Sequence, residues 1–215
     1  MSNEIITRQA MPPGIPSVQQ TGEKNLNVTN NEGGVVNINY NFPQNGIVNS
    51  AEKMMAVKSF SRDYYQLIVT LDEDVFKDNV VSVPTTRALT AGRVPPEIFE
   101  RCSDLSDAGK EELKTFPALI CLENTEMNGR TDPRQMGVYA YIKKIRKDGK
   151  NIKIVFEPLG TFFQFKLCEK KNAVYFDLNM DCAITDLNQC AWSVHKTDLF
   201  EAFDVAGIPN MPGPM

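Results

Sequence analysis

An Asp-Gly pair between two apolar runs is the feature that most constrains how this chain folds. Asp148-Gly149 separates residues 138–145 from residues 151–156, and Ile152, Ile154 and Phe156 occupy alternate positions of the second run. A period of two places such side chains on one buried face of a strand. Asp-Gly readily adopts the positive φ angles of a two-residue hairpin turn. The sequence therefore predicts an antiparallel β-hairpin over 138–156, with its turn at residues 147–150.

The rest of the chain from residue 50 onward alternates between short strand-like and short helix-like segments. A helical pattern covers 51–65, Pro95-Pro96 opens a second helix, and Ser106 caps a third that runs to residue 113. Thr197-Asp198 precedes a fourth helix over 199–205, which Gly207 ends. Runs rich in β-branched and aromatic residues predict further strands at 65–69, 75–83, 116–122, 162–167, 173–178 and 192–194. The fold class we expect is α+β: an antiparallel sheet or small barrel with peripheral short helices.

The composition is that of a globular protein of one or two domains. The 215 residues are 42% hydrophobic and 23% charged, and their net charge of -4 argues against a general duplex-DNA coat while leaving room for a local basic patch. No run of 18 apolar residues exists, and residues 1–20 lack the apolar core of a signal peptide. We therefore expect a cytoplasmic location and no membrane partner.

Common cofactor and metal motifs are missing from the sequence. It contains neither a P-loop nor a dinucleotide-binding glycine pattern. Five cysteines form no C-x-x-C pair, which is typical of reduced, mostly buried thiols. A metal site built from Cys168, Cys182, Cys190 and His195 is disfavoured because their spacing does not bring two thiolates onto one turn. We expect no cofactor and no metal.

The first fifty residues differ from the rest in composition. Residues 1–21 predict a flexible tail, residues 22–49 an Asn-rich β-hairpin and residues 50–215 the folded body. The segment 22–49 contains nine of the eighteen asparagines. They are either the solvated face of an edge hairpin or, in stacked copies, an Asn ladder that joins chains. The candidate assembly residues alternate along one strand: Val36, Asn37, Ile38, Asn39, Tyr40 and Asn41.

Two other segments carry polar candidates. The loop 123–132 gathers Glu123, Glu126, Arg130 and Asp132, which would serve a hydrolase or nuclease-type effector, or else form a solvated connection. His195 is the only histidine, and alternation puts Ser193 on the same face of its strand. A partly exposed histidine at the strand end is the favoured interpretation, with a Cys–His nucleophilic site as the alternative.

The predicted hairpin over 138–156 is strongly basic. Lysines on a hairpin edge prevent aggregation. Cations beside aromatic side chains also bind single-stranded nucleic acid, and a basic surface also suits an acidic protein partner. The candidate binding residues are Tyr139, Tyr141, Lys143, Lys144, Arg146, Lys147, Lys150 and Lys153.

Several short stretches occur together in an order that suggests a family. They are residues 22–25 (GEKN), 114–118 (KTFPA) running to Glu123-Asn124, 139–145 (YAYIKKI) with 151–154 (NIKI), and 192–196 (WSVHK) leading to 206–208 (AGI). In this combination the chain resembles uncharacterised small bacterial proteins associated with anti-phage and mobile-element conflict systems. The resemblance implies a bacterial cytoplasmic setting and action within a multi-component system, and it supplies no catalytic residues.

The sequence thus favours a non-enzymatic interaction or assembly module, which self-associates or docks through the Asn-rich hairpin. We expect a homo-oligomer or a protein partner, with nucleic acid as a further candidate partner. The alternatives are an effector enzyme that uses the loop 123–132 and a single-stranded nucleic-acid binder that uses the basic hairpin 143–153.

Overall fold

The computed structural model describes residues 26–30, 36–40, 51–209 and 211–214. Contacts divide the chain into two units, residues 1–41 and 42–215, which are described separately. In the first unit, β1 (Leu26–Asn30) pairs antiparallel with β2 (Val36–Tyr40), and Leu26 lies opposite Tyr40. The tail 1–21, the turn near 31–34 and Asn41 lie outside the described residues. The Asn-rich hairpin over 22–49 and its role in assembly therefore stay predictions.

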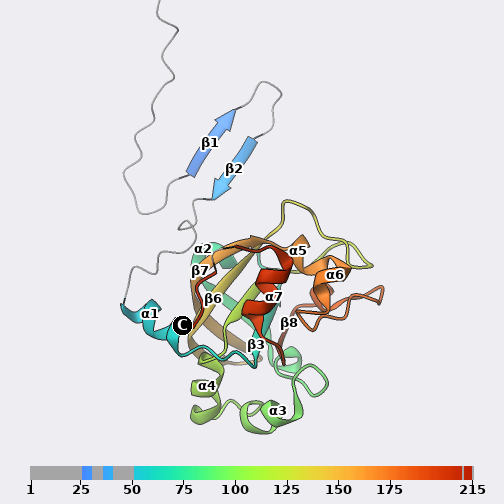
Figure 1. Cartoon of the computed structure of the whole chain (residues 1–215). Coiled ribbons are helices and arrows are strands. Elements are labelled where there is room, and N and C mark those ends of the chain that lie inside the picture. The colour runs from blue at the N-terminus through green and yellow to red at the C-terminus, as the bar shows by residue number, and fades with distance from the viewer. Residues whose placement is uncertain (1–25, 31–35, 41–50, 210, 215) are drawn as a thin grey trace, which may run out of the picture. The chain divides into compact units, whose positions relative to one another are not determined.

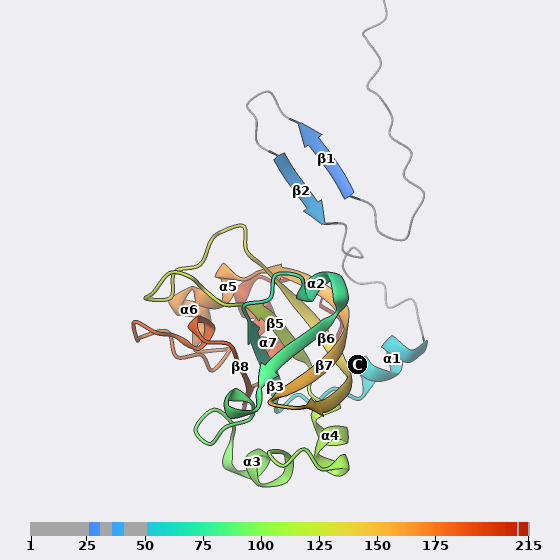
Figure 2. The same cartoon turned by 180° about the vertical axis from the view of Figure 1, so that it is seen from behind.

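The second unit is an α+β body built on a six-stranded sheet, which Figure 1 shows from one side and Figure 2 from behind. Its strands are β3 (Tyr65–Thr70), β4 (Val80–Pro84), β5 (Ala118–Leu122), β6 (Met136–Asp148), β7 (Asn151–Phe163) and β8 (Ala191–His195). The helices are α1 (Ala51–Lys58), α2 (Val75–Asp78), α3 (Pro96–Cys102), α4 (Asp107–Lys114), α5 (Phe165–Cys168), α6 (Lys170–Ala173) and α7 (Leu199–Ala206). Within the described ranges no helix is long and apolar enough to cross a bilayer.

The sheet is mixed and curled rather than wholly antiparallel as predicted. Its strand order is β4-β7-β6-β5-β3-β8, and β3 pairs with β5 in parallel while every other neighbouring pair is antiparallel. A parallel pair needs a long crossover, and residues 71–117 supply one that contains β4, α3 and α4. The edge strands β4 and β8 approach within 8 Å between Cα atoms, so the sheet forms a half-barrel.

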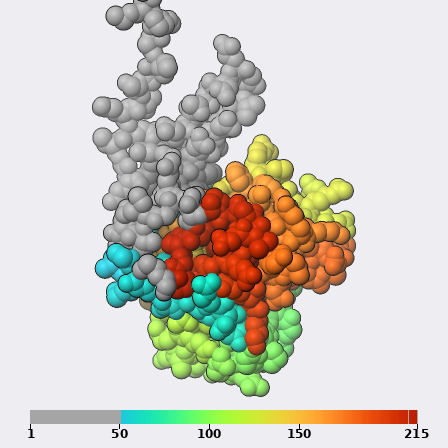
Figure 3. Space-filling view, in the orientation of Figure 1, coloured from blue at the N-terminus to red at the C-terminus, as the bar shows by residue number. Residues whose placement is uncertain are grey.

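Two apolar layers lie on the two faces of this sheet. On β3, Ile68 belongs to one layer, whereas Leu67 and Val69 belong to the other, as strand alternation requires. The first layer includes residues of both edge strands, which places it inside the curl, where α3 and α4 cover it. The second layer packs under α1 and α7, and α7 lies across the face seen in Figure 3. Both faces of β5 are therefore buried, which explains its continuous apolar run.

The helix ends follow the chemistry that the sequence predicts. Ser106 caps α4 by accepting a hydrogen bond from the Gly109 N–H, and Asp198 caps α7 by accepting from Phe200 and Glu201. Gly207 ends α7 with a φ of 63°.

Three predicted strands are wrong in whole or in part. Residues 75–78 form α2, which Asn79 ends at a φ of 55°, so that only 80–84 enter the sheet. Of the predicted strand 162–167, residues 162–163 end β7 and residues 165–167 belong to the short helix α5. The predicted strand 173–178 is not formed, and its first residue ends the short helix α6. Short apolar runs do not distinguish strand from helix, and here the contacts of the folded chain decide between them.

The predicted hairpin over 138–156 is confirmed, and it is longer than expected. β6 and β7 pair from Met136 opposite Phe163 to Asp148 opposite Asn151, and Gly149 takes a φ of 61° in the turn. The register shifts between Ile142 and Lys144. This β-bulge lets Ile142 and Ile145, three residues apart, reach the same apolar layer.

The side-chain amide of Gln66 ties the sheet to the end of α4. Gln66 is fully buried on β3, and its Nε2 donates to the carbonyls of Leu113 and Phe116 at 2.8 and 2.9 Å. Its Oε1 accepts from the indole N–H of Trp192 on β8 at 3.1 Å. Each polar atom of this amide therefore has a partner inside an apolar layer, as a buried amide requires.

We predict that Gln66→Leu lowers the free energy of unfolding by roughly 3 kcal/mol, because it leaves the Trp192 indole N–H and the Phe116 carbonyl buried without partners. Urea unfolding followed by the fluorescence of Trp192, the single tryptophan, measures this loss. Gln135→Leu is the control, because the carbonyl that Gln135 binds, that of Leu122, also accepts from Gln164. Equal stability of the two variants would contradict the role of Gln66.

Candidate functional site

A pocket of about 710 Å³ opens beside the edge strand β8, on the side of Figure 1 where α6 and β8 lie. We call it the His195 pocket. Its lining comes from residues 92–96, from 193–195 of β8, from Lys170, Ala173 and Val174, from residues 177–181 and from Asp186. A concave site with an apolar wall and a few convergent polar groups is the usual form of a ligand site.

The polar groups on the β8 side of the pocket are the side chains of Ser193 and His195. They lie two residues apart on β8, so both point to the same face, as the alternation predicts. The Ser193 Oγ lies 2.9 Å from His195 Nε2, and His195 Nδ1 lies 2.9 Å from the carbonyl oxygen of Asp177. A carbonyl accepts but never donates, which assigns the proton of a neutral imidazole to Nδ1. Nε2 then accepts from the Ser193 hydroxyl.

Asp177, from another segment of the pocket lining, contacts the same imidazole. Its carboxylate lies 3.6 Å from His195 Nδ1, and its side chain is 62% exposed. Its backbone has a φ of 53°, an unusual left-handed conformation for a residue other than glycine. The contacts of Asp177 and Ser193 with the two nitrogens of one imidazole form a Ser–His–Asp series, in which the histidine is placed to accept the serine proton.

Tyr65 of β3 fixes the backbone around Asp177. Its ring stacks on the His195 ring with centroids 5.0 Å apart, and its hydroxyl donates to the Phe176 carbonyl at 2.6 Å. Burial raises the pKa of Tyr65 well above its usual range, so the hydroxyl stays a donor at neutral pH. Tyr65 and His195 therefore bind two consecutive carbonyls and hold the left-handed turn in place.

The opposite wall of the pocket begins at Pro95-Pro96 and is anchored through α3. Glu97 accepts hydrogen bonds from Lys196 at 2.7 Å and from Tyr64 at 2.8 Å. The hydrogen bond from the Lys196 ammonium, with that from Tyr64, lowers the pKa of Glu97 to about 2. The carboxylate therefore stays charged in neutral solution, and it links the start of α3 to the residue that follows β8.

Charged and apolar groups surround the mouth of the pocket. Val174 is 71% exposed and Tyr175 beside it is 42% exposed. Lys170 lies 3.7 Å from Asp181, and Asp186 accepts a hydrogen bond from the Asn179 N–H. The lining holds two cations, Arg93 and Lys170, against three aspartates. The mouth thus combines the exposed apolar side chain of Val174 with an excess of carboxylates.

The structure gives the acids of the loop 123–132 separate partners. Glu123 accepts from the Cys190 N–H at 2.8 Å, and Asp132 pairs with Arg134 at 3.3 Å. Glu126 and Arg130 are exposed. In the described part of the chain, no group of three His, Cys, Asp or Glu side chains is placed to hold a metal ion. The loop itself packs along residues 179–185, since the Asn128 N–H donates to the Ala183 carbonyl, and both segments lie at the right of Figure 3.

The predicted binding residues of the basic hairpin separate into buried and exposed groups. Tyr139 and Tyr141 are 0% and 5% exposed in the layer under α1 and α7, where they cannot stack on bases. Lys143 pairs with Glu52, Lys153 pairs with Asp148, and Lys147 donates to the Asp104 carbonyl. Lys144, Arg146 and Lys150 are exposed.

The burial of His195 differs from what the sequence favoured. This residue is buried, with 7% exposure, rather than a partly exposed strand-end residue, because residues 175–178 fold over the end of β8. Its two ring nitrogens contact Ser193 and Asp177, and neither contact involves a cysteine. All five cysteines are free thiols, and burial raises the pKa of Cys102 to about 11.

Sequence reasoning missed most of the His195 pocket. Asp177 falls within a segment predicted as a strand, and residues 92–96 carried no signal beyond Pro95-Pro96. The sequence did place Ser193 and His195 on one face of their strand. It gave no indication that Asp177 would contact the same imidazole.

Comparison with protein-family models, with curated proteins and with solved structures finds no match for this chain.

We predict that Tyr65→Phe speeds hydrogen exchange of the backbone amides over 176–181. The variant loses the hydrogen bond to the Phe176 carbonyl, and a net loss of about 1 kcal/mol makes local opening about five-fold more frequent. Hydrogen exchange measured by mass spectrometry on peptides of this segment tests it. Tyr64→Phe, which loses its hydrogen bond to Glu97, should leave 176–181 unchanged. Unaltered exchange in Tyr65→Phe would show that the turn does not depend on Tyr65.

Proposed function

We propose that this chain is a non-enzymatic interaction module of a bacterial cytoplasmic system with several components, such as an anti-phage defence system. In this proposal its body docks a peptide segment of a protein partner in the His195 pocket, and the Asn-rich hairpin over 22–49 adds self-association. The free thiols of all five cysteines are consistent with a reducing compartment.

The observation that carries the proposal is the combination of a prearranged polar floor with an exposed apolar mouth. Both imidazole nitrogens of His195 have partners, so the floor keeps one geometry without a ligand. Val174, an exposed apolar side chain of the pocket lining, favours burial against a partner. Preorganised sites lose less conformational entropy when they bind.

The charges of the pocket support a basic residue in the docked segment. The Asp177 carboxylate is largely exposed, and the lining holds three aspartates against two cations. A lysine or arginine beside an apolar side chain would place the apolar group against Val174 and the cation near Asp177. Complementary charge at such a rim would add specificity and speed of association.

We predict that random peptides displayed on phage and selected on the immobilised protein converge on apolar residues next to a basic one. Val174→Glu and Asp177→Asn should each weaken a selected peptide at least about ten-fold, which corresponds to about 1.4 kcal/mol. Val205→Glu is the matched control, because Val205 is an exposed valine on α7 outside the pocket. Selection without convergence, or equal binding by all four proteins, would overturn the proposal.

Hydrolysis by acyl transfer is a second candidate function, and the contact of 2.9 Å between Ser193 Oγ and His195 Nε2 favours it. In that function His195 would take the Ser193 proton as Oγ attacks a carbonyl carbon, and would give that proton to the leaving group as its bond to the carbon breaks. The low exposure of Ser193, 6%, and its place on a regular strand rather than a sharp turn favour the binding function instead.

A fluorophosphonate reagent distinguishes the two functions, because it phosphonylates an activated serine hydroxyl with loss of fluoride. We predict no mass increase on the intact protein after incubation with this reagent. Ser193→Ala serves as the control that assigns any label to Ser193. Labelling of the wild-type protein that this variant abolishes would establish the hydrolase function and remove the non-enzymatic one.

A further inference from the structure

The β-bulge of β6 turns a row of cations toward solvent. Because the register shifts between Ile142 and Lys144, Ile145 enters the inner apolar layer and its neighbours Lys144 and Arg146 face the other way. Lys153 of β7 lies directly opposite Arg146, and Lys150 lies in the turn. These four residues, Lys144, Arg146, Lys150 and Lys153, are called the basic strip.

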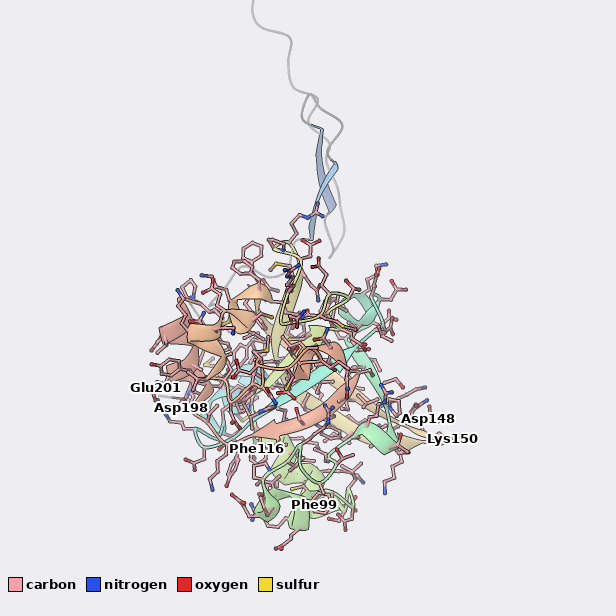
Figure 4. All side chains as sticks on the ribbon, turned by 90° about the vertical axis from the view of Figure 1, so that its right-hand side faces the viewer. Phe99, Phe116, Asp148, Lys150, Asp198 and Glu201 are labelled. Atoms are coloured by element: carbon pink, nitrogen blue, oxygen red, sulfur yellow. The ribbon has the colours of Figure 1, made fainter. Side chains whose placement is uncertain are left out.

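One carboxylate, that of Asp148, pairs with the basic strip. Asp148 pairs with Lys153 at 2.6 Å, and the hydrogen bond from Lys153 lowers its pKa. Within the described ranges of the chain, Lys144, Arg146 and Lys150 have no carboxylate within 4.0 Å of their side-chain nitrogens. Figure 4 shows Asp148 and Lys150 at one edge of the body, on the opposite side from Asp198 and Glu201.

One pairing within the strip is unfavourable for the sheet. Like charges directly opposite each other on neighbouring strands destabilise the pair, and Arg146 faces Lys153 in this way. A local conflict of this kind is typical of a position kept for function rather than for folding.

We propose that the basic strip binds the phosphate backbone of a nucleic acid without reading its bases. Side chains two apart on a strand lie about 6.6–6.8 Å from each other, so Lys144, Arg146 and the facing Lys153 form a compact row of cations. Such a row matches the closely spaced phosphates of a nucleic-acid strand. Arginine and lysine both bind phosphate oxygens, and arginine does so with two parallel hydrogen bonds.

Two features define how the strip binds. Tyr139 and Tyr141 are buried, so bases have no stacking surface from these residues and sequence has no direct influence. β4 pairs with β7 up to Pro84 opposite Asn151, so the end of the hairpin is three strands wide. A sheet of that width is wider than the two-stranded ribbon that the major groove of DNA admits, so the contact is with backbone phosphates alone.

Fluorescence anisotropy with labelled oligo-dT and with a labelled mixed-sequence duplex tests this inference on the full chain. With three to four phosphates contacted, the logarithm of the association constant should fall with the logarithm of salt concentration at a slope of about −2 to −4. The triple variant Lys144→Glu, Arg146→Glu, Lys150→Glu should lose at least about ten-fold in affinity and most of this slope. The two probes show whether single strands or duplexes bind more tightly.

A variant with the same change in net charge is the control. Lys58→Glu, Lys166→Glu, Lys171→Glu places the three reversals outside the basic strip and should retain both affinity and slope. An equal loss in both triple variants would mean that net charge alone drives binding, and it would overturn the proposal. Binding of labelled polyglutamate as tight as that of oligo-dT would overturn it too, in favour of an acidic protein partner.

Arg146→Thr separates binding from folding. It removes the like-charge pair with Lys153 and introduces a residue that strands favour, so the thermal midpoint should equal or exceed that of the wild-type protein. Affinity for oligo-dT should fall. A lower midpoint together with unchanged affinity would show that Arg146 serves the sheet rather than the ligand. Because the strip and the His195 pocket share no residue, this result is independent of peptide docking.

Discussion

The buried amide of Gln66 is the interaction on which the arrangement of the body depends. It joins three elements that are distant in sequence, since β3 carries it, the end of α4 accepts from it and Trp192 of β8 donates to it. An amide can satisfy its donors and its acceptor inside an apolar layer only if all its partners are in place together. The interaction therefore fixes the position of the end of α4 over the inner face of the sheet. It also fixes the position of the edge strand β8 relative to β3. The pocket beside β8 depends on that placement.

Two local features of the body give it two different surfaces. At the β8 edge, residues 175–178 fold over the strand end, and Tyr65 and His195 bind the carbonyls of Phe176 and Asp177. Polar groups that would be costly to bury are thereby paired, and a pocket remains between this turn and residues 92–96. At the β6–β7 end, the bulge sends isoleucines inward and cations outward. The proposed peptide site and the proposed phosphate site thus arise from two local features, a turn that folds over the end of β8 and a bulge in β6.

Much of the local structure was predictable because its causes are local. Asp148-Gly149 and the alternation of Ile152, Ile154 and Phe156 specify the hairpin, and the caps at Ser106, Asp198 and Gly207 specify helix ends. The candidate site was much less predictable. Ser193 and His195 share a face by alternation alone, but Asp177 reaches His195 from a segment that the pattern assigns to a strand. Tyr139 and Tyr141 looked available for stacking because sequence does not say that α1 and α7 cover them.

The sequence by itself determined the α+β class, the central hairpin, the helix caps and the concentration of lysine and arginine near residue 146, because each follows from a few neighbouring residues. Only the tertiary structure decided the parallel pairing of β3 with β5, the bulge after Ile142 and the convergence of Ser193, His195 and Asp177. These features depend on contacts between residues far apart in the chain. Their free energies come from hydrogen bonds between buried polar groups and from the packing of the two apolar layers. No short window of sequence contains both residues of such a contact.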